Sequence, residues 1–200
     1  MLKRSVPKIA CRQILLLVSG VALLGGQEPY RTVTVILRDL YGVRPVTASR
    51  MESDVAKIFL RAGIQLHFVT GAATTVPVPG SYELQLLGGD APGKPGVLGR
   101  ALLGERSGQY AALYVETIRK VASDACWGEA ELLARVGAHE LGHLLLNSPD
   151  HSRAGLMQAN WAPEYLLRIP HTQLVFLSDD VEMLNLRFGR MRTSNFEEVI

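Results

Sequence analysis

The feature that most constrains this chain is a long apolar segment that carries polar side chains at fixed spacing. Residues 130–145 read AELLARVGAHELGHLL, and nonpolar side chains occupy nearly every direction around a helix drawn through them. Such a segment predicts a helix buried on all sides. His139, Glu140 and His143 lie inside it, and polar groups buried there without partners would be strongly destabilising. They must therefore be paired within the protein, as satisfied core residues, or bind a ligand.

The three polar residues form the pattern His-Glu-x-x-His. With 5 histidines in 200 residues, roughly 0.007 accidental copies are expected in a chain of this composition. Residues four apart lie one above the other on a helix face, so His139 and His143 can bind one ion. Neutral imidazole suits Zn²⁺, which lowers the pKa of a bound water to about 7. Glu140 neighbours this face and can take a proton from such a water.

A catalytic zinc needs a third protein ligand, and the chain offers a histidine eight residues after His143. Together, residues 129–161 resemble the metzincin clan of zinc endopeptidases, whose signature HExxHxxGxxH precedes a turn with a methionine below the metal. The resemblance implies a Zn²⁺ cofactor bound by His139, His143 and His151. It also implies that Glu140 is the general base and that Met157, within Gly155-Leu156-Met157, belongs to the methionine turn.

The match departs from the family after His143. Leu146 stands where the family has its glycine, Pro149 stands where it has its third histidine, and His151 follows two residues later. Asn147 tolerates the left-handed conformation that ends a helix, and Pro149 prevents continuation. We therefore expect the turn one residue late and the return loop one residue longer than in the family.

Two other side chains remain candidates for the third ligand. Asp150 lies nearer the family spacing than His151 does. Glu164 lies 21 residues after His143, which is similar to another large group of HExxH enzymes. Against Glu164, the preceding Ala162-Pro163 and the surrounding sequence lack the helical acidic pattern of that group.

The rest of the chain predicts a strand, a helix and a strand in a parallel crossover, followed by two more strands. The predicted strands are 32–37, 65–69, 82–87 and 109–115, the predicted helices outside the motif are 47–62 and 178–188, and 88–108 is predicted to be a glycine-rich loop. In the metzincin family the edge strand lines the cleft, and Gln109–Val115 corresponds to it by order.

The predicted fold class is α+β and metzincin-like. It has a mixed sheet with two helices above an active-site cleft and a short C-terminal subdomain with a terminal helix. A single metallopeptidase domain spans 27–200, with an upper part at about 30–147 and a lower part at about 148–200.

The first 26 residues are typical of a secretory signal peptide. Four basic residues and no acid precede the apolar run Ile14–Leu24, which is too short to span a bilayer. These residues account for the formal net charge of +2, and the remainder is slightly acidic, so we expect no nucleic-acid partner. Removal of the segment would leave no stable membrane span and one cysteine, Cys126, too few for an internal disulfide.

The sequence thus predicts a secreted or periplasmic zinc metallopeptidase that acts on peptides or proteins; it does not specify an oligomeric state. One alternative is a non-catalytic secreted module that binds metal or a partner on the same scaffold. Glu140 argues against it, because a structural zinc needs a fourth protein ligand and no base. Another is a zinc hydrolase acting on non-peptide amides.

Overall fold

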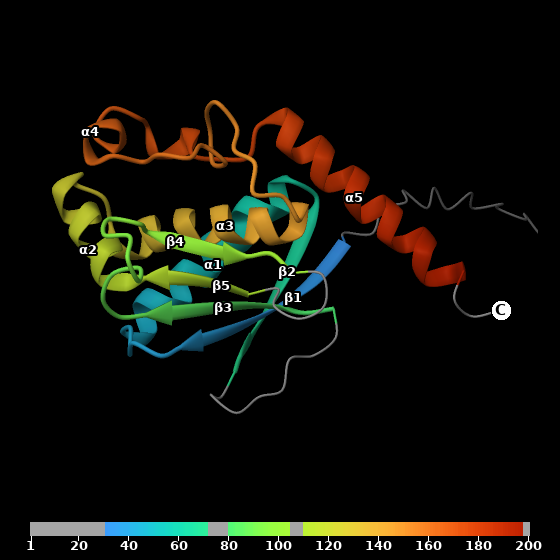
Figure 1. Ribbon diagram of the computed structural model, residues 1–200, viewed down its shortest axis with the longest axis horizontal. Coiled ribbons are helices and arrows are strands. Elements are labelled where there is room, and N and C mark those ends of the chain that lie inside the picture. The colour runs from blue at the N-terminus through green and yellow to red at the C-terminus, as the bar shows by residue number, and fades with distance from the viewer. Residues whose placement is uncertain (1–30, 72–79, 105–109, 198–200) are drawn as a thin grey trace, which may run out of the picture.

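The computed structural model describes residues 31–71, 80–104 and 110–197, and the predicted signal peptide lies outside them. The elements in chain order are β1 (Arg31–Asp39), α1 (Pro45–Arg61), β2 (Ile64–Thr70), β3 (Tyr82–Leu87), β4 (Gly99–Leu102), β5 (Tyr110–Tyr114), α2 (Val115–Asp124), α3 (Glu129–Leu146), α4 (Pro163–Leu166), the 3₁₀ turn η1 (His171–Gln173) and α5 (Ser178–Glu197). Figure 1 shows the sheet beneath α3, with α4 and α5 above it.

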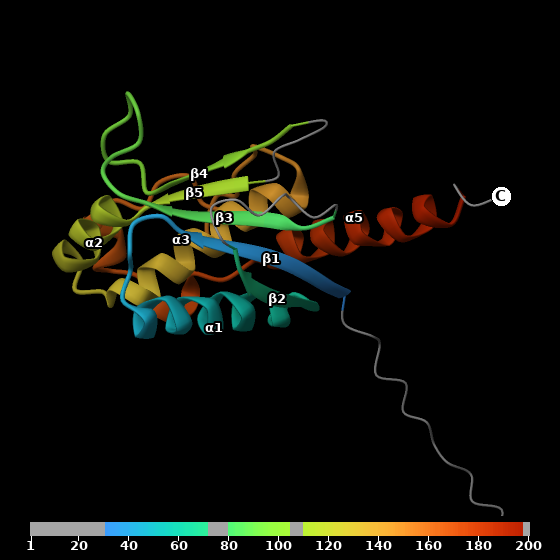
Figure 2. The same ribbon diagram turned by 90° about the horizontal axis from the view of Figure 1, so that it is seen from below.

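The strands form one mixed sheet in the order β2-β1-β3-β5-β4. Four of them are parallel, and β4 alone runs antiparallel to its neighbour β5. The predicted parallel crossover from β1 through α1 to β2 is confirmed. Helix α1 starts with Pro45, whose missing N–H is no loss in a first turn, and Gly63 follows its end with φ +78°. Figure 2 shows the strands from β2 at one edge to β4 at the other.

The expectation for the edge strand is wrong. Residues 109–115 do contain a strand, β5, but it lies between β3 and β4 and is an inner strand of the sheet. The edge is β4, a four-residue strand inside the segment predicted to be a loop. Strand β5 pairs with both β3 and β4, whereas β4 pairs with β5 alone among the described strands. Strand β4 is therefore the edge beside the cleft described below.

Helices α1 and α3 lie side by side against one face of the sheet and form the main core with it. Phe59 of α1, Leu84 of β3, Leu113 of β5 and Leu141 of α3 are all completely buried there. Gly137 of α3 faces this core, where a Cβ would make ordinary contacts with Leu84 and Leu113. The all-round apolar pattern of α3 is explained by this position between the sheet, α1 and the C-terminal segment.

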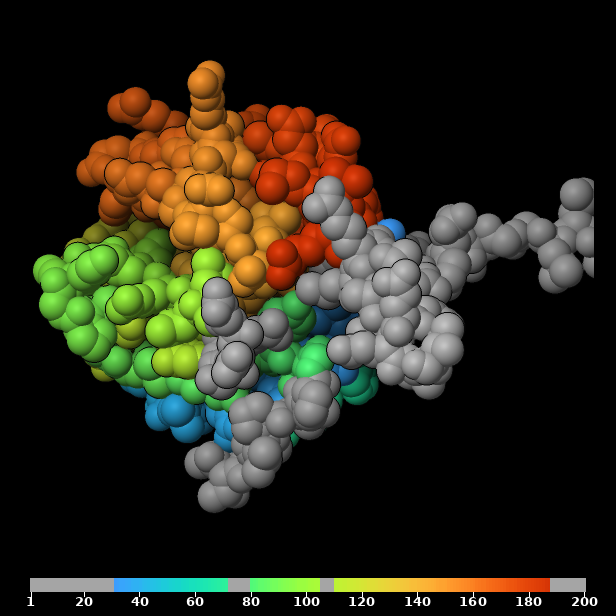
Figure 3. All heavy atoms as spheres, turned by 45° about the vertical axis from the view of Figure 1, so that its right-hand side comes forward, coloured from blue at the N-terminus to red at the C-terminus, as the bar shows by residue number. Residues whose placement is uncertain are grey.

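The C-terminal segment from Ser148 onward lies over α3 as an upper layer. In the space-filling view its orange and red atoms lie above the green atoms of the β3–β4 region (Figure 3). Asp180 fixes the start of α5 by accepting hydrogen bonds from the Leu177 amide at 2.9 Å and the Ser152 hydroxyl at 2.6 Å. The predicted terminal helix is confirmed and continues to residue 197. The sequence did not identify α2 or α4. Among the described residues, no helix combines the length and apolar character needed to cross a membrane.

Candidate metal centre

Helix α3 places two histidines and a glutamate in the interior beside the upper layer. His139, Glu140 and His143 are each less than 9% exposed on a helix whose other residues are mostly apolar. Residues four apart share a helix face, and the rings of His139 and His143 are accordingly 4.6 Å apart between centroids. The predicted buried helix with paired imidazoles is thus observed.

The end of α3 turns the chain back toward these imidazoles. Asn147 has φ 48° and ψ 44°, the left-handed conformation that stops a helix, and the Ser148 amide donates to the His143 carbonyl at 3.2 Å. The following residues return over the helix end and bring His151 to the face of His143. The turn therefore occurs at Asn147, as the sequence predicts.

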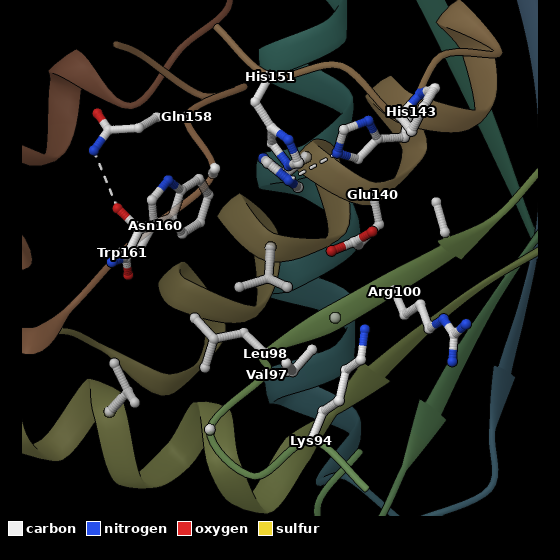
Figure 4. Close-up of a pocket in the computed structure, with 18 of the residues that line it drawn as sticks. Lys94, Val97, Leu98, Arg100, Glu140, His143, His151, Gln158, Asn160 and Trp161 are labelled. Carbon is white, nitrogen blue, oxygen red and sulfur yellow. Dashed lines mark hydrogen bonds between the residues drawn. The ribbon is translucent and has the colours of Figure 1, made fainter. Parts of the chain in front are cut away.

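Three imidazole rings meet at this point. His151 lies 4.7 Å from His143 and 5.4 Å from His139 between ring centroids. One nitrogen from each ring lies within 4.8 Å of the other two, which is the only such group of potential metal ligands in the described part of the chain. Figure 4 shows His143 and His151 at the top of a pocket with Glu140 below them.

The hydrogen bonds of the two buried histidines fix which nitrogens face inward. The Nδ1 atom of His139 is 2.7 Å from the Leu156 carbonyl oxygen, and Nδ1 of His143 is 2.8 Å from that of Ser148. A carbonyl only accepts, so both Nδ1 atoms carry the proton and both Nε2 atoms carry lone pairs. These Nε2 atoms are 3.0 Å apart. Two neighbouring lone pairs without a proton between them are repulsive, and a shared cation removes the repulsion.

The protonation of the buried histidines suits metal binding. Burial lowers the pKa of His139 to about 4, against a smaller opposing effect of the hydrogen bond to Leu156. Burial likewise lowers the pKa of His143. Both imidazoles are therefore neutral at pH 7, which is the form that binds metal ions. Neutral nitrogen donors with carbonyls on their other ring nitrogen match the support that zinc-bound histidines ordinarily receive.

Glu140 lies where α3 and the edge strand β4 approach each other. A Cβ at Gly99 would be 2.7 Å from the Glu140 carboxyl oxygen, so only glycine lets the strand come this close. The carboxyl group is hydrogen-bonded to the backbone of Ala101, and burial raises the pKa of Glu140 to about 8. A cation held by the nearby imidazoles would favour the ionised carboxylate, because an opposite charge lowers the pKa of an acid.

The methionine singled out by the sequence lies beneath the histidine pair. Met157 is 1% exposed, and its Sδ atom would be 2.7 Å from a Cβ at Gly142, between the two histidines. Its neighbour Leu156 supplies the carbonyl that orients His139. The Ser152 amide donates to the Met157 carbonyl at 2.9 Å and closes the loop. This hydrogen bond thus joins the loop that carries His151 to the methionine segment beneath the histidines.

This packing predicts the effect of Gly142→Ala. The added methyl group would be 2.7 Å from Met157 Sδ and 3.1 Å from the Phe176 ring, so the side chains beneath the histidines must shift. Overpacking of this kind costs ~1–3 kcal/mol of folding free energy. We expect weaker zinc binding in a chelator titration and a lower melting temperature. Gly137→Ala is the matched control on the same helix, because its Cβ would make ordinary contacts of 3.4–3.6 Å; equal loss of zinc in both variants would contradict the role of Met157.

A cleft of about 710 Å³ opens in front of the imidazoles. The edge strand and the segment before it form one wall, and residues 158–163 of the upper layer form the other. Trp161 contacts the His139 ring edge-on at 5.3 Å between centroids. The histidines and Glu140 thus face a space large enough for several residues of an extended peptide.

The remaining candidates lie outside the cluster of imidazoles. Asp150 is exposed and accepts a hydrogen bond from the Ser148 hydroxyl at 2.8 Å. Glu164 is exposed on α4. Another histidine of the upper layer, His171, also lies outside the cluster, since it pairs with Glu131 at 2.9 Å and stacks on Trp127. Sequence reasoning missed β4, which lies inside the segment predicted to be a loop.

No family model and no curated protein matches this sequence. Solved structures do match this chain in fold. One of them is archaemetzincin from Methanopyrus kandleri, with a TM-score of 0.57 and 16% sequence identity over 79% of this chain and 96% of that one. This likeness confirms the predicted α+β, metzincin-like fold.

Proposed function

We propose that the chain is an exported zinc metallopeptidase that cleaves peptide bonds, with His139, His143 and His151 as ligands and Glu140 as general base. The observation that carries the proposal is the convergence of three imidazole nitrogens beside a buried carboxyl group, in a cleft edged by a strand. The metallopeptidase-like fold supports it independently of these residues. Export is proposed from the N-terminal sequence pattern alone.

The side chains fit a zinc ion by their chemistry. Zinc favours nitrogen donors and, in catalytic centres, three protein ligands with one open position. A zinc ion bound there would supply a water of lowered pKa and polarise the scissile carbonyl. The Leu156 and Ser148 carbonyls keep the two buried imidazoles in the tautomer that points Nε2 toward the ion.

Glu140 performs the proton transfers in this proposal. Its carboxylate accepts a proton from the attacking water and delivers it to the leaving amide nitrogen. Low exposure keeps bulk water from competing for that proton. The close approach of Gly99 and the hydrogen bond to Ala101 hold the carboxyl group in one place.

Strand β4 is positioned to bind the substrate backbone. The Tyr114 amide donates to the Leu98 carbonyl, so in antiparallel alternation Leu98 and Arg100 direct their backbone groups toward β5. Gly99 and Ala101 then direct theirs outward. An extended peptide can add to this edge as a further strand and present its backbone beside Glu140.

Metal analysis of the purified chain, coupled to cleavage of a peptide library, tests this function. We expect about one zinc per chain, hydrolysis at internal peptide bonds, loss of hydrolysis with a chelator and recovery on adding zinc. Bound zinc without any hydrolysis would favour the non-catalytic module. Hydrolysis of acylated amines or other non-peptide amides, but not of peptides, would favour the hydrolase that acts on non-peptide amides.

A further inference from the structure

Two basic side chains line the cleft on the side of the edge strand. Lys94 lies in the segment before β4 and Arg100 lies within β4, and both are exposed. Neither belongs to any ion pair between described residues. Figure 4 shows both below Glu140 and across the pocket from Trp161, with Lys94 extending up toward the strand.

The segment that carries Lys94 is fastened to the sheet and to α2. The Gly89 amide donates to Glu116 at 3.0 Å, and the Thr117 hydroxyl donates to Asp90 at 2.5 Å. The Lys94 amide itself donates to the Ala91 carbonyl at 3.0 Å, which closes a turn. Ala91 and Val97 also pack in a small apolar cluster with residues 112 and 114 of β5. The backbone under Lys94 is thus held at one side of the cleft.

Arg100 lies at the edge to which a substrate backbone would add. It lies between Gly99 and Ala101, the two residues whose backbone groups face outward along the edge. A peptide added to this edge therefore passes beside the Arg100 side chain. Because side chains alternate along a strand, Arg100 also points away from the face on which Gly99 meets Glu140.

The charges around the cleft are unbalanced. Among its lining residues, the fully charged side chains are Lys94 and Arg100, and the only carboxyl group is that of Glu140. That carboxyl group is hydrogen-bonded to the Ala101 backbone. The opposite wall is mainly apolar or uncharged, with Trp161, Ala162 and Pro163. A cleft lined by positive side chains attracts anionic ligands and orients them toward those side chains.

We propose that Lys94 and Arg100 select substrates that carry a carboxylate within a few residues of the scissile bond. This inference rests on the proposed peptidase function and names its substrate class. The carboxylate can belong to an aspartate or glutamate side chain or to a free C-terminus. Either would pair with the two cations while the substrate backbone lies along β4.

The test compares four peptides of one sequence frame: with glutamate or glutamine beside the scissile bond, each with an amidated or a free C-terminus. We expect kcat/KM for the best carboxylate-bearing peptide to exceed that for the neutral amidated peptide by about 10-fold, since each exposed ion pair contributes modestly. Raising the salt concentration should narrow this ratio, because it screens exposed charges. The amidated glutamate peptide and the free-acid glutamine peptide carry one carboxylate each, so comparing them separates a side-chain preference from a terminal one.

The double variant Lys94→Gln/Arg100→Gln should reduce the ratio to near one, because kcat/KM for the carboxylate-bearing peptide falls toward that for the neutral peptide. Arg44→Gln/Arg50→Gln is the matched control, because it removes the same charge from exposed positions on the α1 side of the molecule. Cleavage without any carboxylate preference, or an equal loss of preference in the control, overturns the inference and leaves the peptidase function standing.

Binding to the Glu140→Gln variant separates the two proposals. Suppose that the unaltered protein cleaves no peptide, but the variant binds the glutamate peptide more tightly than the glutamine peptide. If this preference in binding also needs Lys94 and Arg100, the selection of carboxylates stands and the peptidase function fails. If the unaltered protein cleaves no peptide and the variant binds none at millimolar concentration, both the peptidase function and the selection of carboxylates are wrong.

Discussion

Glu140→Gln is expected to keep its zinc and to lose peptide hydrolysis. The amide has nearly the same size as the carboxyl group and can still accept the hydrogen bond of the Ala101 backbone. It cannot take a proton from water, so turnover should fall by ~10²–10⁴-fold, the usual contribution of a general base. Zinc content per chain and kcat on a cleaved peptide, measured on the same preparation, check both halves of the expectation.

The control for this variant is Glu164→Gln. Glu164 is an exposed glutamate of the upper layer that lies outside the histidine cluster, and the same chemical change there should leave zinc content and kcat unaltered. Because Glu140 is buried, its variant also needs a melting curve; unchanged thermal stability attributes the lost turnover to chemistry. Full hydrolysis by Glu140→Gln would remove this residue from the mechanism.

The features of the centre that the sequence predicted best are those that depend on residues close together in the chain. The spacing of His139 and His143 follows from helix geometry, and the apolar residues around them require burial. The end of α3 was predictable because Asn147 adopts the left-handed conformation more readily than most residues. His151 follows this turn by only four positions, so the short loop keeps it near the end of α3.

The edge of the sheet was not predictable in the same way. Strand β4 has four residues, includes a glycine and follows a segment rich in turns, so its local sequence resembles a loop. Its strand character comes from pairing with β5, which lies later in the chain. Strand order depends on such long-range contacts, whereas the residues of Gln109–Val115 only indicate that a strand exists.

The hydrogen-bond partners of the histidines could not be predicted from the sequence either. Any residue can supply a carbonyl oxygen, so no sequence pattern marks Leu156 or Ser148 as partners of the imidazoles. The same holds for the contact between Gly99 and Glu140, which joins residues 41 positions apart and depends on how β4 crosses α3. The signal for the methionine was stronger, since Gly155-Leu156-Met157 resembles a known turn.

His151→Ala is expected to have the largest effect on metal binding outside α3. His151 is exposed, and its ring makes no hydrogen bond to another described residue, in contrast to the rings of His139 and His143. Its removal should therefore leave the core intact. Loss of a ligand should weaken zinc binding by more than the ~10–100-fold that loss of a group supporting a ligand costs. Zinc should leave this variant under mild chelation, with an unchanged melting temperature of the metal-free protein.

Asp150→Ala provides the comparison that decides the third ligand. Asp150 bonds to the Ser148 hydroxyl, and the Ser148 carbonyl orients His143, so its loss should act only through this neighbour. We expect Asp150→Ala to retain zinc under the chelation that empties His151→Ala, with at most a ~10–100-fold weaker affinity. The reverse order would make Asp150 the ligand and His151 its support. Retention of zinc by both variants would leave His139 and His143 as a metal pair with a partner outside this loop.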